Sequence, residues 1–398
     1  MTKRRDHGDG GIDARGRDAW RLRYRVDGKR FSKTLRGTLS EARKELRRLV
    51  RSGDTGEHIA PDKITLATWV DQWIAAGAPG RRQKRVGRRT LERYGELLRC
   101  HVVPLLGARP LQQIQATEVD KLYQKLEGKI APRTAHHVHT VLGSCLKTAV
   151  RKGLLVASPL LRAEKVPSPG ESDHGIALDE TELRVLLDGF KGSVLFPIVA
   201  VAAFTGARRN EILGLRWSDL DVEKKTLRIE RAVEQVHKQP LALKPPKTER
   251  GKRTIALDDD LIALLCAERQ KHLRLMVGVP DGAAVNFLLA KLPDDALMFP
   301  NPPSPGESFS FIKLRNPDNT TKEFVRKARK LGFPHLRLHD LRGTHETLLL
   351  DAGVPVHVVA TRCGHDPAVL LRSYAKSTKK ADTSAAEIIG KLAKGMLD

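Results

Sequence analysis

A stretch rich in proline and glycine divides this chain of 398 residues. Residues 162–175, RAEKVPSPGESDHG, contain Pro167, Pro169, Gly170 and Gly175, which interrupt the helical patterns on both sides. A chain of this length is expected to fold as about two or three domains rather than one. We therefore interpret residues 162–175 as a linker and expect independent domains before and after it.

Basic residues are concentrated before this linker. The whole chain carries a formal net charge of +24. Residues 1–161 hold 34 Lys and Arg against 16 Asp and Glu, whereas residues 162–398 hold 37 against 31. An excess of this size favours a polyanionic partner, most commonly nucleic acid, over a surface that is merely solvated. We expect the first part of the chain to grip DNA and the second to be a balanced globular domain.

The N-terminal segment has the pattern of a strand with one arginine-rich face. Between Trp20 and Val26, apolar residues alternate with Arg21, Arg23 and Arg25, and the Asp-Gly pair that follows is typical of a hairpin turn. A helix capped by a serine comes next. The arginine face is either simply solvated or in contact with DNA, and three arginines on one strand favour DNA.

Residues 64–161 show the apolar spacing of an all-helical domain, with helices expected near 90–102, 117–127 and 132–152. The segment 81–93 is strongly basic, and in this chain we interpret it as a contact with the DNA backbone rather than as a solvated loop. The residues assigned to this contact are Arg81, Arg82, Lys84, Arg85, Arg88 and Arg89.

After the linker, the residues suited to phosphate chemistry lie mostly in one stretch, 338–376. His339 and Arg342 are three apart and so share one face of a helix. His365 follows a glycine, and Tyr374 follows nine residues later. Two imidazoles, a guanidinium and a phenol can bind a phosphate and attack it. Of the four tyrosines in the chain, only Tyr374 follows such a cluster.

Cleavage of a phosphodiester adds negative charge to the non-bridging oxygens, which preorganised arginines stabilise. The leaving alkoxide needs a proton from Lys or His, and a side-chain hydroxyl can form a covalent intermediate. Near the stretch, Asp and Glu form no cluster with metal-binding spacing, and the four cysteines show no paired spacing. We therefore expect neither a metal nor a cofactor.

Four motifs in this half of the chain resemble the tyrosine recombinases of the phage integrase family. They are TGARRNEILGLRW, PKTERGKRTIAL, HDLRGTHETLLLDAG and RCGHDPAVLLRSYAK. The resemblance implies a catalytic set made of Arg208, Lys247, His339, Arg342, His365 and Tyr374. Two positions depart from the family pattern without removing a catalytic group: Gly343 stands where many relatives have His, and Cys363 where Leu is common. Lys252, in the same basic loop as Lys247, is the alternative general acid.

The resemblance also implies the fold class, which is multidomain and mainly α. Residues 1–60 would form an arm-type DNA-binding domain with a small three-stranded sheet and a helix. Residues 61–161 would form the all-helical, SAM-like core-binding domain. Residues 176–398 would form a mostly helical catalytic domain with a small sheet. The apolar stripe of the tail, 385–396, either docks on a neighbouring protomer or packs on its own domain.

The function implied is that of a site-specific integrase that works on double-stranded DNA at attachment sites, as a homotetramer and without a metal. A directionality factor and a host DNA-bending protein are further partners of such enzymes. No signal peptide or membrane-spanning stretch is visible, and we expect a cytoplasmic protein. Two alternatives stay open: a type IB topoisomerase-like enzyme, and a non-catalytic DNA-binding or architectural protein.

Overall fold

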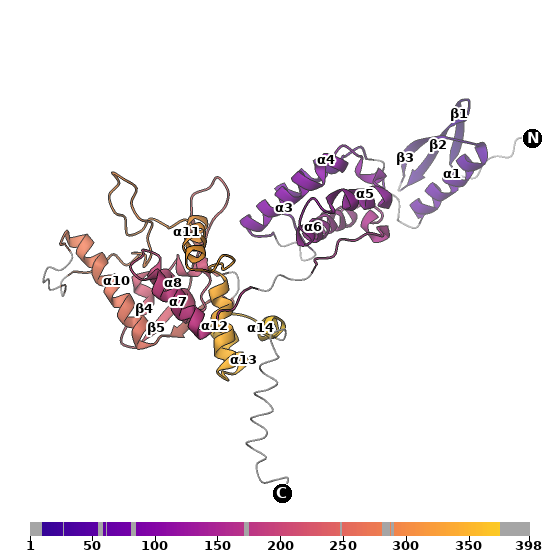
Figure 1. The fold of residues 1–398 in the computed structure, drawn as a ribbon. Helices are drawn as coiled ribbons and strands as arrows, with labels where there is room; N and C mark the ends of the chain where they lie inside the picture. Colours follow the sequence, from indigo (N-terminus) through magenta and orange to yellow (C-terminus); the bar gives the residue numbers. More distant parts are fainter. Residues whose placement is uncertain are drawn as a thin grey trace, which may run out of the picture. The chain divides into compact units, whose positions relative to one another are not determined.

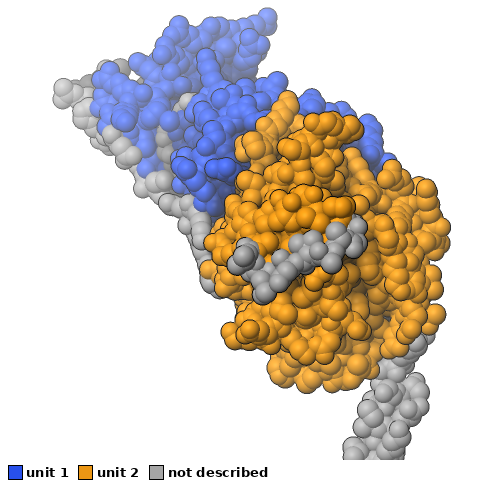
Figure 2. Space-filling view, turned by 90° about the vertical axis from the view of Figure 1, so that its left-hand side faces the viewer, with its two compact units in different colours: residues 1–172 blue, residues 173–398 orange. Residues whose placement is uncertain are grey.

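The computed structural model divides the chain into two compact units, residues 1–172 and 173–398 (Figure 2). The residues that it describes are 10–26, 28–54, 59–60, 62–80, 85–170, 175–246, 249–280, 287 and 290–374. No helix in these ranges is long and apolar enough to cross a membrane. Each unit is built around hydrophobic clusters of its own.

The first unit begins with a three-stranded antiparallel sheet in the order β1-β2-β3 (Figure 1). Its elements are β1 (Gly11–Gly16), β2 (Ala19–Val26), β3 (Lys29–Arg36) and the following helix α1 (Leu39–Asp54). Leu22 and Tyr24 of β2 are buried with Ala42, Leu46 and Leu49 of α1. Since successive side chains on a strand alternate between faces, the β2 arginines lie on the face away from α1. The expected sheet and helix are confirmed.

Helices make up the rest of the first unit, as the apolar spacing predicts. They are α2 (Leu66–Ala75), α3 (Arg88–His101), α4 (Val103–Leu106), α5 (Ala116–Leu126) and α6 (Pro132–Arg151), with short 3₁₀ turns at Leu111–Gln113 and Pro159–Arg162. The Thr65 side chain caps α2. Trp69 of α2 is buried and donates from Nε1 to the carbonyl of Cys145 in α6, at 3.2 Å. Such contacts join helices that are distant in sequence.

The first half of the predicted linker is bound to this helical part. Asp120 of α5 accepts hydrogen bonds from the backbone N–H groups of Glu164 and Lys165, at 3.0 and 3.2 Å. The Nδ1 atom of His136 in α6 lies 2.8 Å from the carbonyl oxygen of Pro167. A carbonyl can only accept, so Nδ1 must carry the hydrogen of this bond.

The second unit is mainly helical, with α8 at its centre (Figure 1). Its helices are α7 (Glu180–Phe190), α8 (Phe196–Thr205), α9 (Arg209–Ile212), α10 (Asp259–Val277), α11 (Pro317–Lys330), α12 (Asp340–Asp351), α13 (Val356–Cys363) and α14 (Pro367–Tyr374). Further 3₁₀ turns lie at Trp217–Asp219 and Glu249–Gly251. Nearly every α8 side chain is buried, which agrees with a helix that is apolar on all sides.

Two small antiparallel sheets complete this unit and confirm the expected minor β content. One has the order β4-β5-β8 and consists of β4 (Leu220–Asp221), β5 (Thr226–Ile229) and β8 (Arg253–Ala256). The other pairs β6 (Ala232–Glu234) with β7 (Ala242–Lys244). The sequence predicts one strand over 227–233, whereas the structure has two in separate sheets. The break falls at Glu230 and Arg231, where Arg231 turns to an ion pair with the buried Asp219.

Gly206 ends α8 in a left-handed conformation, with φ +61°. Glycine adopts this conformation at little cost because it has no Cβ. Here the space is limiting as well. A Cβ on Gly206 would lie 2.7 Å from Cδ2 of His345 and 2.9 Å from Sγ of Cys363. The turn therefore needs glycine both for its backbone angle and for the close approach of α12 and α13.

Gly206→Ala should destabilise the second unit more than Gly192→Ala does. Gly192 is also left-handed, with φ +72°, but a Cβ there would meet nothing within 4 Å. We expect a loss of about 1 kcal/mol at Gly192 from backbone strain alone, and about 1–3 kcal/mol more at Gly206 from overpacking. Urea denaturation of both variants gives the difference. Equal losses would mean that the packing around Gly206 yields freely.

Candidate active site

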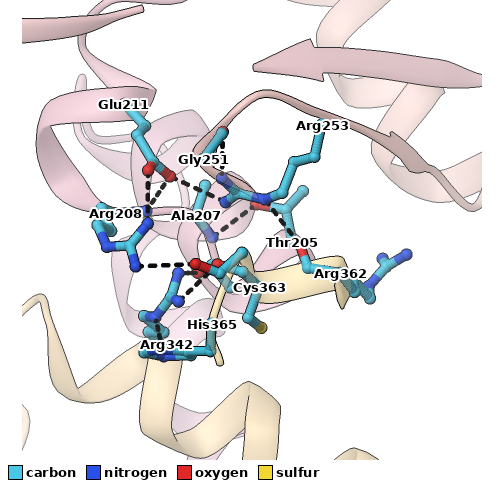
Figure 3. Close-up of polar contacts among 12 residues, drawn as sticks. Thr205, Ala207, Arg208, Glu211, Gly251, Arg253, Arg342, Arg362, Cys363 and His365 are labelled. Atoms are coloured by element: carbon cyan, nitrogen blue, oxygen red, sulfur yellow. Dashed lines mark hydrogen bonds and ion pairs between the residues drawn. The ribbon is translucent and has the colours of Figure 1, made fainter. Parts of the chain in front are cut away.

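Arg208 occupies the position directly before the short helix α9, and its side chain belongs to the candidate site (Figure 3). Its Nη1 donates to Oε1 of Glu211 at 2.8 Å, and its Nη2 donates to the carbonyl of Gly364 at 3.3 Å. Its side chain is 39% exposed. A guanidinium has five N–H groups, so Arg208 keeps donors for a ligand while it is held by two protein acceptors.

Glu211 is buried between two arginines. Arg253, the first residue of β8, donates from Nη2 to Oε2 of Glu211 at 2.9 Å, and both side chains are only 5% exposed. Burial alone would raise the pKa of this carboxyl, but the hydrogen bonds and charges of Arg253 and Arg208 outweigh burial and hold the pKa below its ordinary value. The ionised Glu211 thus fixes the direction in which Arg208 points.

Arg342 is buried in α12 and bonded on several sides (Figure 3). Its Nη1 donates to the Gly206 carbonyl at 2.6 Å, and its Nη2 to the Cys363 carbonyl at 2.5 Å. Its Nε lies 3.1 Å from Nε2 of His365 and 3.2 Å from Oε1 of Glu346. Burial lowers the pKa of Arg342 from its ordinary value. An arginine nevertheless keeps its proton under all ordinary conditions.

His365 follows the left-handed glycine that ends α13, and its ring lies beside Arg342. Its Nε2 is also 2.9 Å from Oε1 of Glu346, which is one turn after Arg342 on α12. Burial opposes ionisation of Glu346, but the hydrogen bond from His365 and the charge of Arg342 keep its pKa below the ordinary value. The side chains of Arg342, Glu346 and His365 are therefore in mutual contact.

The last carbonyls of α8, which have no N–H partner within the helix, are contacted by side chains of α12 and α13. His345 approaches the Ala203 carbonyl with Nδ1 at 2.8 Å, and Arg362 donates from Nη2 to the Phe204 carbonyl at 3.0 Å. Arg362 also donates from Nε to Nε2 of His345, at 3.2 Å. The His345 ring must then be neutral with its hydrogen on Nδ1. Burial and the charge of Arg362 lower the pKa of His345 to about 4.

His339 lies at the start of α12, one turn before Arg342. Much of its surface is open to solvent. The surrounding protein still desolvates the ring, and this effect, followed by the charges of Arg342 and Arg208, lowers the pKa of His339 from its ordinary value. A neutral imidazole at this position can accept a proton.

The structure describes the remaining predicted catalytic residues only in part. Lys247 and the tail 385–396 lie outside the described residues. Lys252 is exposed just before β8. Arg250, also in this loop, forms an ion pair of 2.6 Å with Asp366, the residue directly before α14. Tyr374 is the last residue of α14, and only its backbone is described. The ion pair thus connects the loop before β8 to the residue that precedes the helix carrying Tyr374.

Two family models match the chain. The phage integrase family matches residues 193–381, and the phage integrase central domain matches residues 66–165. The chain belongs to the phage integrase family of tyrosine recombinases. It is therefore a site-specific recombinase, an enzyme that cleaves and rejoins DNA strands.

Known members of the family resemble this recombinase over most of its length. An integrase of Streptomyces ambofaciens is 27% identical over 98% of this chain and 97% of its own. The Tn1549 transposon integrase bound to a circular intermediate DNA has a TM-score of 0.62 at 17% identity, over 82% of this chain and 99% of its own. A lambda integrase tetramer bound to a Holliday junction has a TM-score of 0.53 at 15% identity, over 91% and 97%.

The structure brings together Arg208, Arg342 and His365 around the turn at residues 363–365, with His339 one turn away. Sequence reasoning missed the residues that hold them, namely Glu211, Arg253, His345, Glu346 and Arg362. Two of these have a visible signal. Glu211 is three residues after Arg208, and Glu346 is four after Arg342, the spacings at which helical side chains meet. The other three act across long sequence separations and have no local signal.

The basic residues of the recombinase that are predicted to bind DNA are only partly described. Arg23, Arg25, Arg85, Arg88 and Arg89 are exposed, and Arg21 is half-buried. Arg23 pairs with Asp13 at 2.8 Å, and Arg89 with Glu92 at 2.6 Å. Arg81, Arg82 and Lys84 lie outside the described residues. Within the described part of the chain, no group of three or more His, Cys, Asp or Glu side chains could hold a metal ion.

Acidification should destabilise the recombinase through His345. The pKa of this ring is about 4 in the folded protein and about 6.5 in an unfolded chain, so the unfolded state binds more protons between these values. The contribution of His345 to the free energy of unfolding is fully present above pH 6.5, and about 3 kcal/mol of it is lost as the pH approaches 4.

His345→Gln removes this titration, and the amide of the new side chain can still donate and accept hydrogen bonds. The slope of unfolding free energy against pH, from urea denaturation between pH 4 and 7, should therefore be shallower in the variant. His272, whose pKa burial also lowers to about 4, contributes equally to both proteins and cancels. Identical slopes would show that His345 does not titrate in this way.

Proposed function

We propose that this recombinase is an integrase of a mobile genetic element and that it acts through a covalent 3′-phosphotyrosyl intermediate. The observation that carries the proposal is the convergence of Arg208, Arg342 and His365 on one backbone turn, with the two arginines held by protein acceptors. Such a fixed set of donors suits the charge of a scissile phosphate in its transition state. The likeness to an integrase along almost the whole chain supports the same role.

Each group has a role in the proposed cleavage. The Tyr374 hydroxyl attacks phosphorus and its proton passes to His339, whose lowered pKa leaves it neutral and able to accept. The bond between phosphorus and the 5′ oxygen breaks, and Lys247 or Lys252 protonates the leaving oxygen. Arg208, Arg342 and His365 bind the non-bridging oxygens throughout.

Rejoining reverses these steps. The 5′-hydroxyl of a partner strand attacks the phosphotyrosyl link and releases Tyr374. The bond energy is kept in the link, so strands exchange without an external energy source.

The parts of the chain take different roles in this proposal. Residues 1–60 bind arm-type sites through the arginine face of β2. The core site is bound by the two domains that the linker 162–175 connects, residues 61–161 and 176–398. Four protomers assemble on two duplexes, a proposal supported by the likeness to a lambda integrase tetramer bound to a Holliday junction. Accessory partners are a directionality factor and a host bending protein, and the reaction takes place in the cytoplasm of a bacterial or phage-infected cell.

Tyr374→Phe should abolish the covalent adduct and keep DNA binding. The substrate is a nicked suicide duplex that carries the attachment sequence flanking the gene, incubated with the full chain and a metal chelator. Denaturing gel electrophoresis detects the adduct and a mobility shift detects binding. Wild-type adduct on any duplex would instead favour a topoisomerase-like enzyme, and its complete absence a non-catalytic DNA-binding protein.

A substrate with sulfur in place of the bridging 5′ oxygen separates Lys247 from Lys252. A thiolate leaves without protonation, so this substrate should restore cleavage only to the variant that lacks the general acid. We expect Lys247→Ala to lose about 100-fold or more in cleavage rate on the ordinary duplex and to recover on the sulfur substrate. Lys252→Ala is the matched control from the same loop. Recovery of the Lys252 variant alone would reverse the assignment.

A further inference from the structure

Arg253 is the first residue of β8, and its buried guanidinium joins three parts of the second unit (Figure 3). Its Nη2 donates to Oε2 of Glu211 at 2.9 Å, on the side of the site where Arg208 lies. Its Nε donates to the carbonyl of Arg362 at 2.8 Å, and its Nη1 donates to the carbonyl of Gly251 at 3.1 Å. The last two bonds connect the loop before β8 to the end of α13.

This loop packs closely on the turn at residues 363–365. A Cβ on Gly364 would lie 2.9 Å from the carbonyl oxygen of Arg250 and 3.1 Å from Nη1 of Arg253. Only a residue without a side chain allows such an approach. The turn is also the one that accepts hydrogen bonds from both arginines of the proposed phosphate site. The described end of the loop therefore lies against the backbone at which the scissile phosphate would bind.

Both candidates for the general acid belong to the same loop. Lys252 directly precedes Arg253, and Lys247 lies outside the described residues. A general acid must come within hydrogen-bond distance of the leaving oxygen, and a displacement of about 1 Å can cost about 100-fold in rate. Proton delivery thus depends on how well the loop is held at the turn.

Two arginines fasten the described part of the loop, and they differ in strength. Arg250 forms an ion pair with Asp366 in which both side chains are more than half exposed. An exposed ion pair of this kind stabilises little. The bonds of Arg253 are buried, where a donor left without its acceptor is costly. Arg253 is therefore the stronger of the two attachments.

A guanidinium suits this position because its donors leave from three nitrogens. Arg253 uses each of them for a different acceptor, and Glu211 balances its charge. A lysine has a comparable charge but carries its donors on a single atom at the end of a flexible chain. It can keep the ion pair with Glu211, but it cannot reproduce the bonds to the carbonyls of Arg362 and Gly251 at the same time.

We propose that Arg253 is a positioning residue for proton transfer to the leaving 5′ oxygen. It holds the loop before β8 against the turn at 363–365, so that the lysine that serves as general acid meets the phosphate bound there. The proton passes from this lysine to the 5′ oxygen as the bond to phosphorus breaks, and Arg253 keeps its own proton. This inference rests on the proposed function, from which it takes the phosphate site and the general acid.

The sulfur-bridged duplex tests this role. A leaving oxygen needs a proton and a leaving sulfur does not, whereas both substrates need the charge stabilisation that Arg208 and Arg342 supply. We expect Arg253→Lys to lose about 10- to 100-fold in single-turnover cleavage rate on the ordinary duplex, measured at saturating DNA, and to recover most of that loss on the sulfur duplex. Arg253→Gln is a second variant with the same expected pattern.

The ratio of the two rates separates positioning from stability. Each preparation is assayed on both substrates, and any unfolded fraction lowers the two rates equally. A purely structural role for Arg253, or a role exerted through Arg208 alone, would slow both reactions and leave the ratio at its wild-type value. That result would overturn the proposal.

Two further exchanges of arginine for lysine serve as controls. Arg228→Lys changes the neighbouring strand β5, where the guanidinium pairs with Asp219 and Glu230, and it should keep the wild-type rates on both substrates. Arg208→Lys removes a phosphate-binding group and should be slow on both.

A double variant adds a second criterion. Arg253→Lys combined with the lysine variant that the sulfur substrate restores should be hardly slower than that lysine variant alone, since both changes affect one step. A multiplicative loss would assign Arg253 to a different step and refute the inference. A wild-type chain that forms no adduct on either duplex would refute the proposed function itself. A wild-type adduct together with an unrestored Arg253 variant refutes the role of Arg253 alone.

Discussion

The catalytic unit depends on how the C-terminal end of α8 is bonded. A helix ends with carbonyls that lack partners and carry partial negative charge. Here Arg342, His345 and Arg362 approach or donate to the carbonyls of Gly206, Ala203 and Phe204. These side chains come from two helices more than 100 residues later in the chain. The hydrogen bonds that satisfy these carbonyls therefore also bring Arg342 close to Arg208, which follows α8 in the chain.

The same contacts explain why the site is organised before DNA arrives. The left-handed Gly206 lets α12 and α13 approach closely, and Arg342 joins the backbone at residue 206 to that at residue 363. Arg208 reaches the neighbouring Gly364 carbonyl, while Glu211 and Arg253 fix it from the other side. Donors placed in this way need little rearrangement during the reaction, which is the usual source of electrostatic catalysis.

Much of this could be predicted from the sequence, for identifiable reasons. The alternation around Arg21, Arg23 and Arg25 predicts the sheet, and the family motifs pick out Arg208, His339, Arg342 and His365, which the structure brings near one another. The single strand expected over 227–233 is divided in the structure into β5 and β6, and the break lies where Arg231 pairs with the buried Asp219. The roles of Arg253 and Arg362 could not be predicted, since the groups that accept their hydrogen bonds are distant in sequence and come close only in the folded chain. A local pattern reports what a residue can do, but not which distant group it will meet.

The paired arginines also shape the thermodynamics of DNA binding. Counterion release comes from cations that reach phosphates and from DNA charge that they neutralise. Glu211 and Glu346 already compensate two of the three arginines around the site, so engaging the scissile phosphate changes the ion atmosphere little. Before the linker, by contrast, 34 Lys and Arg stand against 16 Asp and Glu, so the positive charge of that part is far from balanced. In the proposed function, where the first unit supplies much of the DNA contact, raising the salt concentration should weaken DNA binding. The cleavage rate of the bound complex should change little, so that affinity and catalysis depend on different parts of the chain.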